Sequence, residues 1–110
     1  MKILVAVAWP YVNGNLHLGH IAGAMLPADI FARFHRQKGS DTLMITGSDM
    51  HGTPTIVRAE DEEIEPQELA MKYHKEHLET MKKLNLSFNL YTTTDTENHK
   101  EIVQRLFLDL

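Results

Sequence analysis

The sequence predicts an α/β fold in which a parallel sheet is flanked by helices, and three segments lead to this prediction. Residues 3–8 form an unbroken apolar run with the length and composition of a strand buried on both faces. Residues 41–46 form a second strand-like segment, and a long helical pattern separates the two. Two strands joined through a helix pair in parallel by a right-handed crossover. We therefore expect a three-layer α/β domain over residues 1–110.

The first helix is predicted to run from residue 17 or 18 to residue 38, with Gly39 as its C-terminal stop. Gly23 and Pro27 lie inside this pattern, and a proline in a helix interior costs about 3 kcal/mol. A kink or break is therefore expected near residues 24–27. The apolar face of this helix is predicted to comprise Leu18, Ile21, Ala22, Met25, Phe31 and Phe34.

Two further helices are predicted after the second strand. Thr53 is the expected N-cap of a short helix that has Pro54 at its first position and ends near Glu60. Pro66 opens a longer helix that ends near Leu84. Its apolar side is predicted to consist of Leu69, Tyr73, Leu78, Met81 and Leu84.

A third strand and a last helix complete the predicted elements. Residues 87–91 alternate between apolar and polar positions, as a strand does. Thr94 and Glu97 have the spacing of a capping box at the start of a helix. The apolar stripe of that helix comprises Ile102, Val103, Leu106, Phe107 and Leu110, and the sequence stops inside it, as a fragment would.

Two loops follow the first two strands, at residues 9–16 and 47–52, and both are expected at the carboxyl edge of the sheet, where parallel α/β folds bind ligands. His17 and His20 are one helical turn apart at the start of the helix, so both can donate hydrogen bonds to phosphate oxygens. Gly19 has no Cβ and allows a ligand to approach the backbone closely. This arrangement predicts a nucleotide site.

Three short motifs in these loops resemble a known family. Residues 17–20, His-Leu-Gly-His, are similar to the HIGH signature of class I aminoacyl-tRNA synthetases. Residues 10–14, Pro-Tyr-Val-Asn-Gly, are similar to the segment before this signature in the enzymes for methionine and the branched aliphatic amino acids. Residues 45–54 resemble the G-[ST]-D-x-H-G-T-P block of the methionyl-tRNA synthetase family. The resemblance extends through essentially all of the sequence.

The resemblance implies the N-terminal half of a Rossmann-like nucleotide-binding fold, the first part of a class I catalytic domain. It implies a reaction in which the carboxylate of methionine attacks the α-phosphate of ATP, pyrophosphate leaves, and the adenylate passes to tRNA. Methionine, ATP with Mg²⁺ and tRNA are the implied substrates. Zinc is implied, if at all, only in a part of the family's enzymes that this sequence does not contain.

The resemblance also implies roles for individual residues. His17 and His20 form the catalytic pair, which holds phosphates and stabilises charge rather than taking a proton. Asp49 matches the aspartate that holds the α-amino group of methionine, and an Asx turn within its own loop is a compatible second role. Tyr11 is expected to line the pocket for the thioether, and Trp9 to contribute mainly its backbone. The ATP-binding group comprises Asn13, His17, Leu18, Gly19 and His20, the amino-acid-binding group comprises Trp9, Tyr11 and Asp49, and no metal site is expected.

Four other polar residues near these motifs or on the third helix receive structural interpretations. Ser48 is assigned no role, and His51 is expected to support its loop. His74 and His77 also have a one-turn spacing, but two ligands do not make a zinc site. A solvated polar face is therefore the expected role of this second histidine pair.

Composition and charge limit the function further. The chain has no cysteine, no apolar run long enough to span a membrane, and a net charge of −4. A cytoplasmic protein without a membrane segment is therefore expected, and the main tRNA-binding surface, which should be basic, is expected outside this sequence.

Two other functions remain open from the sequence alone. Small-metabolite nucleotidylyltransferases also carry an H-x-G-H motif, and a synthetase-derived module could bind a partner without catalysis. The K-M-S-K-S-like loop, which in the synthetases binds the departing pyrophosphate, does not occur in this sequence. The chain alone is therefore expected to be inactive and, with an exposed sheet edge and exposed apolar helix faces, to self-associate.

Overall fold

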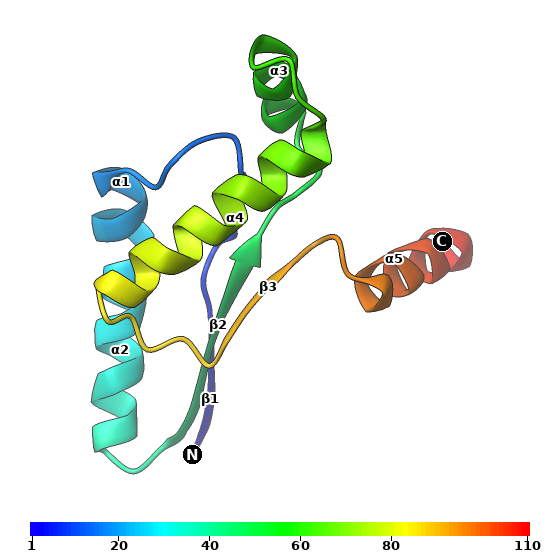
Figure 1. Cartoon of the computed structure of the whole chain (residues 1–110). Helices are drawn as coiled ribbons and strands as arrows, with labels where there is room; N and C mark the ends of the chain where they lie inside the picture. The colour runs from blue at the N-terminus through cyan, green and yellow to red at the C-terminus, as the bar shows by residue number, and fades with distance from the viewer.

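A three-stranded parallel sheet in the order β1-β2-β3 forms the centre of the computed structural model, which describes residues 1–110 (Figure 1). The strands are β1 (Lys2–Ala6), β2 (Asp41–Ser48) and β3 (Leu90–Thr93). The helices are α1 (Leu18–His20), the π-helical turn η1 (Ile21–Met25), α2 (Leu26–Gln37), α3 (Thr53–Asp61), α4 (Pro66–Lys83) and α5 (Glu97–Asp109). Both strand pairs are parallel, so the predicted α/β class and the parallel sheet are confirmed.

The helices pack on one face of this sheet only. Val7 and Met44 on that face form a core cluster with residues from η1, α2 and α4. The opposite face carries Leu4, Leu43 and Leu90, which are 64%, 51% and 51% exposed. The expectation that the first strand is buried on both faces is therefore wrong, and the third layer is not present in this chain. The reason is positional, because β1 is an edge strand and no helix here covers its second face.

The first helical segment changes type ahead of Pro27, as expected. Ile21–Met25 form a π turn, in which the N–H of Leu26 donates to the carbonyl of Ile21, five residues back. A proline ring collides with the carbonyl four residues before it in a straight α-helix, and the wider turn provides the space. The segment ends as predicted, since Gly39 has a φ of +79° and the N–H of Ser40 donates to His35 O at 3.0 Å.

The π turn also explains why the predicted apolar face of the first helix is only partly right. Met25 is buried, but Leu18 is 81% exposed, and Phe31 and Phe34 are each about half exposed. On α2 the buried residues are Ala32 and Asp29. A periodicity of 3.6 residues loses phase across a π turn, so the pattern read before the turn does not identify the inward face after it.

Asp29 is buried without loss of its charge because its carboxylate is fully engaged. It accepts hydrogen bonds from Arg33 Nε at 2.7 Å and from the backbone N–H of Ser87 at 2.7 Å, and Ser87 Oγ also donates to it. These bonds tie α2 to the segment that precedes β3.

Three boundaries after β2 differ from their predictions. The N-cap of α3 is Gly52 rather than Thr53, which is already helical. The third strand begins at Leu90 rather than at residue 87. The cap of α5 is Thr96, whose Oγ1 accepts from the N–H of His99 at 3.2 Å, rather than Thr94. Thr94 instead accepts a hydrogen bond from the N–H of Met50 at 2.9 Å, so a tertiary contact uses the hydroxyl that the capping box required.

The helix α4 begins and ends as predicted, and its buried side is partly the predicted one. Leu69, Tyr73 and Met81 are buried as expected, whereas Leu84 is exposed. The helix α5 projects away from the sheet and buries none of its residues (Figure 1). None of the helices combines the length and the apolar character that crossing a bilayer requires.

Candidate nucleotide and amino-acid site

The two histidines of the first motif are locked to each other. His17 is the N-cap of α1, and its Nδ1 accepts from the N–H of Gly19 at 3.0 Å. His20 Nδ1 in turn lies 3.4 Å from the N–H of His17, which donates to it. The two rings stack with their centroids 3.8 Å apart. The pair is therefore a reciprocal cap built from imidazoles rather than from Ser and Glu.

This capping arrangement fixes what the imidazoles can offer a ligand. Each Nδ1 accepts a hydrogen bond, so in the neutral ring the proton sits on Nε2, which becomes a donor. Partial burial lowers the pKa of His20, and the neighbouring His17 and His77 lower it further. His20 therefore remains neutral at physiological pH. The pair can give hydrogen bonds to anionic oxygens without first gaining protons.

Gly19 leaves room for the close approach of the His17 ring. A Cβ at position 19 would lie 2.9 Å from His17 Cε1 and 3.0 Å from His17 Nδ1. Any larger residue there would push the ring away from the amide that it accepts from.

The second loop meets the first through its backbone. Tyr11 and Asp49 form an isolated parallel bridge, with the N–H of Asp49 donating to Pro10 O at 3.0 Å. Asp49 Oδ1 accepts from the N–H of His51 at 3.3 Å, which is the Asx turn expected from the sequence. The other carboxylate oxygen of Asp49 makes no hydrogen bond within the chain, and it is available to a ligand.

A cavity of about 240 Å³ brings the first loop and the helix together. Its lining includes Trp9, Tyr11 and His20, and the remaining lining residues are Ala8, Pro10, Ala24 and Met25. Asp49 is joined to this group through its bridge to Tyr11. The structure thus gathers five of the sequence-predicted site residues, His17, His20, Trp9, Tyr11 and Asp49, around one end of the sheet.

Two aromatic rings cover glycines near the end of β2, Gly47 within the strand and Gly52 in the loop that follows it. A Cβ on Gly47 would lie 2.7 Å from Trp9 Cζ3, and a Cβ on Gly52 would collide with the ring of Tyr11. The indole of Trp9 therefore packs against β2, and the expectation that Trp9 serves the amino-acid site mainly through its backbone stays a prediction. The packing is possible because residue 47, which is far from residue 9 in sequence, has no side chain of its own.

Two predicted residues lie apart from this group. Asn13 is exposed and borders a shallow groove along α3, together with Thr53, Pro54, Val57, Arg58 and Asp61. The side chain of Leu18 points into solvent. Neither of them lines the cavity that His20 lines.

The second histidine pair contradicts the prediction of a solvated polar face. His77 is only 1% exposed, and its Nε2 lies 2.7 Å from Gly14 O. Half-buried His74 lies with its Nδ1 2.9 Å from Ser48 Oγ, and its ring stacks on Tyr91 at 4.7 Å. Burial lowers the pKa of both histidines, more than any neighbouring charge does. The one-turn spacing of these histidines is visible in the sequence. Their hydrogen-bond partners, Gly14 and Ser48, are distant along the chain, so the sequence does not indicate them.

Ser48, which the sequence left without a role, is the centre of a buried polar cluster. It is fully buried, directly before Asp49, and its Oγ lies 2.5 Å from Tyr91 OH as well as near His74. Burial raises the pKa of the Tyr91 phenol, so the hydroxyl stays protonated. No pattern in the sequence marks a serine as the centre of such a cluster.

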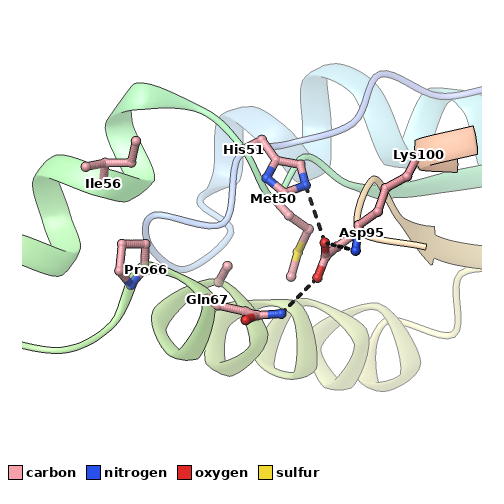
Figure 2. A pocket seen from close by; sticks show the side chains of 8 residues that line it. Met50, His51, Ile56, Pro66, Gln67, Asp95 and Lys100 are labelled. Atoms are coloured by element: carbon pink, nitrogen blue, oxygen red, sulfur yellow. Dashed lines mark hydrogen bonds and ion pairs between the residues drawn. The ribbon is translucent and has the colours of Figure 1, made fainter. Parts of the chain in front are cut away.

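A second cavity, of about 440 Å³, is lined by residues that include Met50, His51 and Asp95 (Figure 2). His51 borders it and lies 3.6 Å from Asp95, which also pairs with Lys100 at 3.5 Å and accepts from Gln67 at 3.1 Å. Met50 forms part of its apolar lining. His51 thus faces a different cavity from that of Trp9 and His20. Nowhere in the chain are three or more His, Cys, Asp or Glu grouped to hold a metal ion.

A parallel sheet with helices between its strands, and with polar side chains in the loops at the carboxyl ends of the strands, is typical of Rossmann-like α/β proteins. The chain belongs to this fold class. Residues 3–110 match the family model described as tRNA synthetases class I (M), and the chain belongs to this family.

Relatives and solved structures agree with this assignment. The methionine–tRNA ligase of Dehalococcoides mccartyi is 53% identical over 109 residues, which are 99% of this chain and 20% of that protein. The methionine–tRNA ligase of Roseiflexus castenholzii is 56% identical over 98% of this chain and 18% of its own length. The chain thus spans about a fifth of the length of these relatives. A nucleotidylyltransferase is not favoured by these similarities.

The fold is shared with solved synthetases for more than one amino acid. Mycobacterium tuberculosis methionyl-tRNA synthetase in complex with methionyl-adenylate has a TM-score of 0.87 at 28% identity, over 91% of this chain and 19% of that one. The LeuRS of Agrobacterium radiobacter, in a ternary complex with tRNA and LeuAMS, has a TM-score of 0.93 at 26% identity, over 99% of this chain and 14% of that one.

Proposed function

We propose that residues 1–110 are the first part of the catalytic domain of a methionine–tRNA ligase and carry groups that bind ATP and methionine. The observation that carries the proposal is the identity of more than half of the aligned residues with ligases for methionine, over nearly the whole chain. The meeting of the imidazole pair, Tyr11 and the free oxygen of Asp49 at one end of the sheet supports it.

In the proposed reaction His17 and His20 act on the phosphates of ATP. A carboxylate oxygen of methionine forms a bond to the α-phosphorus, the bond to the bridging oxygen breaks, and pyrophosphate leaves with its electron pair. Charge builds up on the phosphate oxygens, and the two Nε2–H groups are donors for it. No proton moves in this step, so neutral imidazoles suffice. A terminal ribose hydroxyl of tRNA then displaces AMP from the adenylate.

The remaining contacts to ATP are proposed for the backbone around Gly19, for Leu18 at the helix start, and for Asn13. Mg²⁺ would enter as the counter-ion of the ATP phosphates, because the chain has no cluster of three ligating side chains to hold it.

The amino-acid side of the proposed site consists of Asp49, Tyr11 and Trp9. The free oxygen of Asp49 would pair with the ammonium group of methionine, and its second oxygen is held by the loop. The rings of Tyr11 and Trp9 would contact the thioether, since sulfur packs well against aromatic edges.

We infer that the chain alone forms no detectable adenylate, because a loop for the departing pyrophosphate is not among its 110 residues. The main tRNA-binding surface would lie outside these residues, because their net charge is −4 and tRNA is itself negatively charged. We infer a cytoplasmic location from this activity and from the absence of cysteine.

The proposal is tested by grafting residues 1–110 in place of the matching segment of the Dehalococcoides mccartyi ligase. We expect methionine-dependent exchange of pyrophosphate into ATP at a rate comparable with that of the ungrafted ligase. His20→Ala should lower the rate by about a hundredfold, as loss of one charge-stabilising donor does. Asp49→Asn should raise KM for methionine more than KM for ATP.

Three outcomes would contradict the proposal. A folded graft without any exchange would indicate a binding module without catalysis. Exchange that depends on another metabolite in place of methionine would indicate a nucleotidylyltransferase. Methionine-dependent exchange by the chain alone would refute the inferred need for further residues.

A further inference from the structure

The helix α4 reaches both proposed substrate loops through the two histidines of its inner side. His77 Nε2 lies 2.7 Å from Gly14 O, in the loop that leads to His17. His74 Nδ1 lies 2.9 Å from Ser48 Oγ, directly before Asp49. His77 therefore contacts the loop of residues 9–16, the ATP loop. His74, one helical turn away, contacts the residue directly before the loop of residues 49–52, the amino-acid loop.

We propose that His74 and His77 are positioning residues, which use the rigidity of α4 to fix the ATP loop and the amino-acid loop relative to each other. The inference rests on the proposed function, since it concerns where those loops hold their ligands. Adenylate formation requires the methionine carboxylate and the α-phosphorus at attacking distance, so the separation of the two loops matters directly.

The contact to Gly14 carries this inference for the ATP loop. Residues 13–16 make no other hydrogen bond, to backbone or to side chain. Apart from this bond, the loop is anchored by Val12, which is fully buried in a cluster that includes Leu69 and Tyr73 of α4, and by Leu16, which packs against the cluster around Met25 and Met44. The segment directly before His17 thus depends on α4 for its one hydrogen bond and for part of its apolar packing.

The chemistry of His77 argues against a role in packing alone. A carbonyl can only accept, so His77 must carry its proton on Nε2 and leave Nδ1 unprotonated. That Nδ1 is buried and has no hydrogen-bond partner. An apolar side chain of the same volume would avoid this unsatisfied acceptor. The residue is therefore best explained by the one bond that it makes.

The contact to Ser48 has a different construction. Ser48 Oγ lies between His74 Nδ1 and Tyr91 OH, and its backbone carbonyl accepts from the N–H of Thr94 at 3.1 Å. The cluster joins β2, β3 and α4 one residue before Asp49. A displacement of His74 would therefore displace Ser48, the residue directly before Asp49.

The test uses matched variants in the grafted ligase. His77→Leu keeps approximate volume and removes the donor, whereas His77→Gln places an amide N–H near the former Nε2. His74→Leu and His74→Asn form the corresponding pair, since an Asn amide reaches the former Nδ1. We expect His77→Leu to raise KM for ATP by about tenfold, the loss of roughly one hydrogen bond, and to leave KM for methionine within about twofold.

For His74→Leu we expect the opposite split, with KM for methionine raised more than KM for ATP. His77→Gln and His74→Asn should each restore most of the affected KM. Equal changes in both KM values, or no rescue by the amide variants, would overturn the inference, because loss of general stability acts on both substrates alike.

A second measurement separates this inference from the proposed function. In the 110-residue chain, ¹H–¹⁵N spectra of histidine rings should show His77 as the Nε2–H tautomer. His77→Leu should shift the amides of residues 13–20 and leave those of residues 49–52 unchanged. A graft without methionine-dependent exchange, together with these shifts, would refute the proposed function but support the positioning role of His77. A protonated Nδ1 on His77, or amide shifts spread over both loops, would refute this positioning role.

Discussion

The stacked histidines at the start of α1 depend on a single missing side chain. Gly19 leaves room for the His17 ring, and its amide holds His17 Nδ1 at 3.0 Å. Because Nδ1 is occupied, the proton of the neutral ring stays on Nε2, where a ligand can use it.

We predict that Gly19→Ala moves the His17 ring with little change in stability. Alanine gains about 1 kcal/mol of helix propensity, and loss of the cap costs about 0.5–2 kcal/mol, so the two effects nearly cancel. NMR of the His17 ring and thermal unfolding measure the two effects separately. Gly23→Ala is the control, because a Cβ there meets nothing within 4 Å. An unmoved His17 ring in Gly19→Ala would contradict the prediction.

The buried carboxylate of Asp29 is predicted to contribute to stability in a pH-dependent way. Burial raises its pKa, but hydrogen bonds from Ser87 and Arg33, with the charge of Arg33, outweigh that effect and leave the pKa lowered. A lowered folded-state pKa means that this stabilisation is present above the unfolded pKa of about 3.9 and is lost as pH falls through the folded value.

Asp29→Asn should therefore destabilise the chain by about 1–3 kcal/mol at pH 7, because an amide NH₂ would face the donors of Arg33 and Ser87. Urea unfolding at pH 7 and at pH 3 measures this. The difference between the native chain and the variant should shrink at the lower pH, and a constant difference would contradict the assigned cause.

The π turn η1 accommodates Pro27, a residue that is unfavourable in the interior of an α-helix. Pro27 follows this turn and lies in the first turn of α2, where its missing N–H costs least. The exposed phenylalanines of α2 result from the same turn, because it changes which side of the helix faces the sheet.

We predict that Pro27→Ala stabilises the chain by only about 1 kcal/mol, well below the roughly 3 kcal/mol cost of proline in a straight helix interior. The reason is that the π turn already removes the ring clash. The urea midpoint of the variant against the native chain measures the gain. A gain near 3 kcal/mol would mean that the proline remains strained.

At the scale of the whole molecule, three partly or fully buried histidines, His20 in α1 and His74 and His77 in α4, make the stability of the chain depend on pH. Burial is the largest cause of the lowered pKa of His20, His74 and His77, and neighbouring histidines add to it for His20 and His74. The folded chain therefore binds fewer protons than the unfolded one. This stabilisation is fully present above the unfolded pKa of about 6.5 and is lost as pH falls below it.

We expect the urea midpoint to fall steadily between pH 7.5 and pH 5. His77→Gln should show a weaker fall, because one of the three buried imidazoles is removed. A midpoint that does not change over this range would contradict the prediction.

The uncovered sheet face and α5 lead to a prediction about association. Leu4, Leu43 and Leu90 lie on the open face, and Phe107 and Leu108 are among the most exposed apolar side chains. We expect the average mass in sedimentation equilibrium to rise above that of the monomer with concentration. Replacing Phe107 and Leu108 by Glu should reduce this rise, and a monomer at all concentrations would refute the prediction.

The sequence by itself determined those features that depend on neighbours along the chain. Gly39 ends the first helix, Pro66 begins α4, and the apolar runs become parallel strands, because backbone conformation and periodicity are local. The two loops with His17, His20 and Asp49 were recognised for the same reason.

The tertiary structure decided what depends on distant contacts. Examples are the inward side of α2, the contact of His77 with Gly14, the cluster of Ser48 with His74 and Tyr91, and the packing of Trp9 on Gly47, all of which join residues far apart in sequence. Hydrogen-bond partners and steric limits of this kind arise only after the elements have packed, and no local periodicity specifies them.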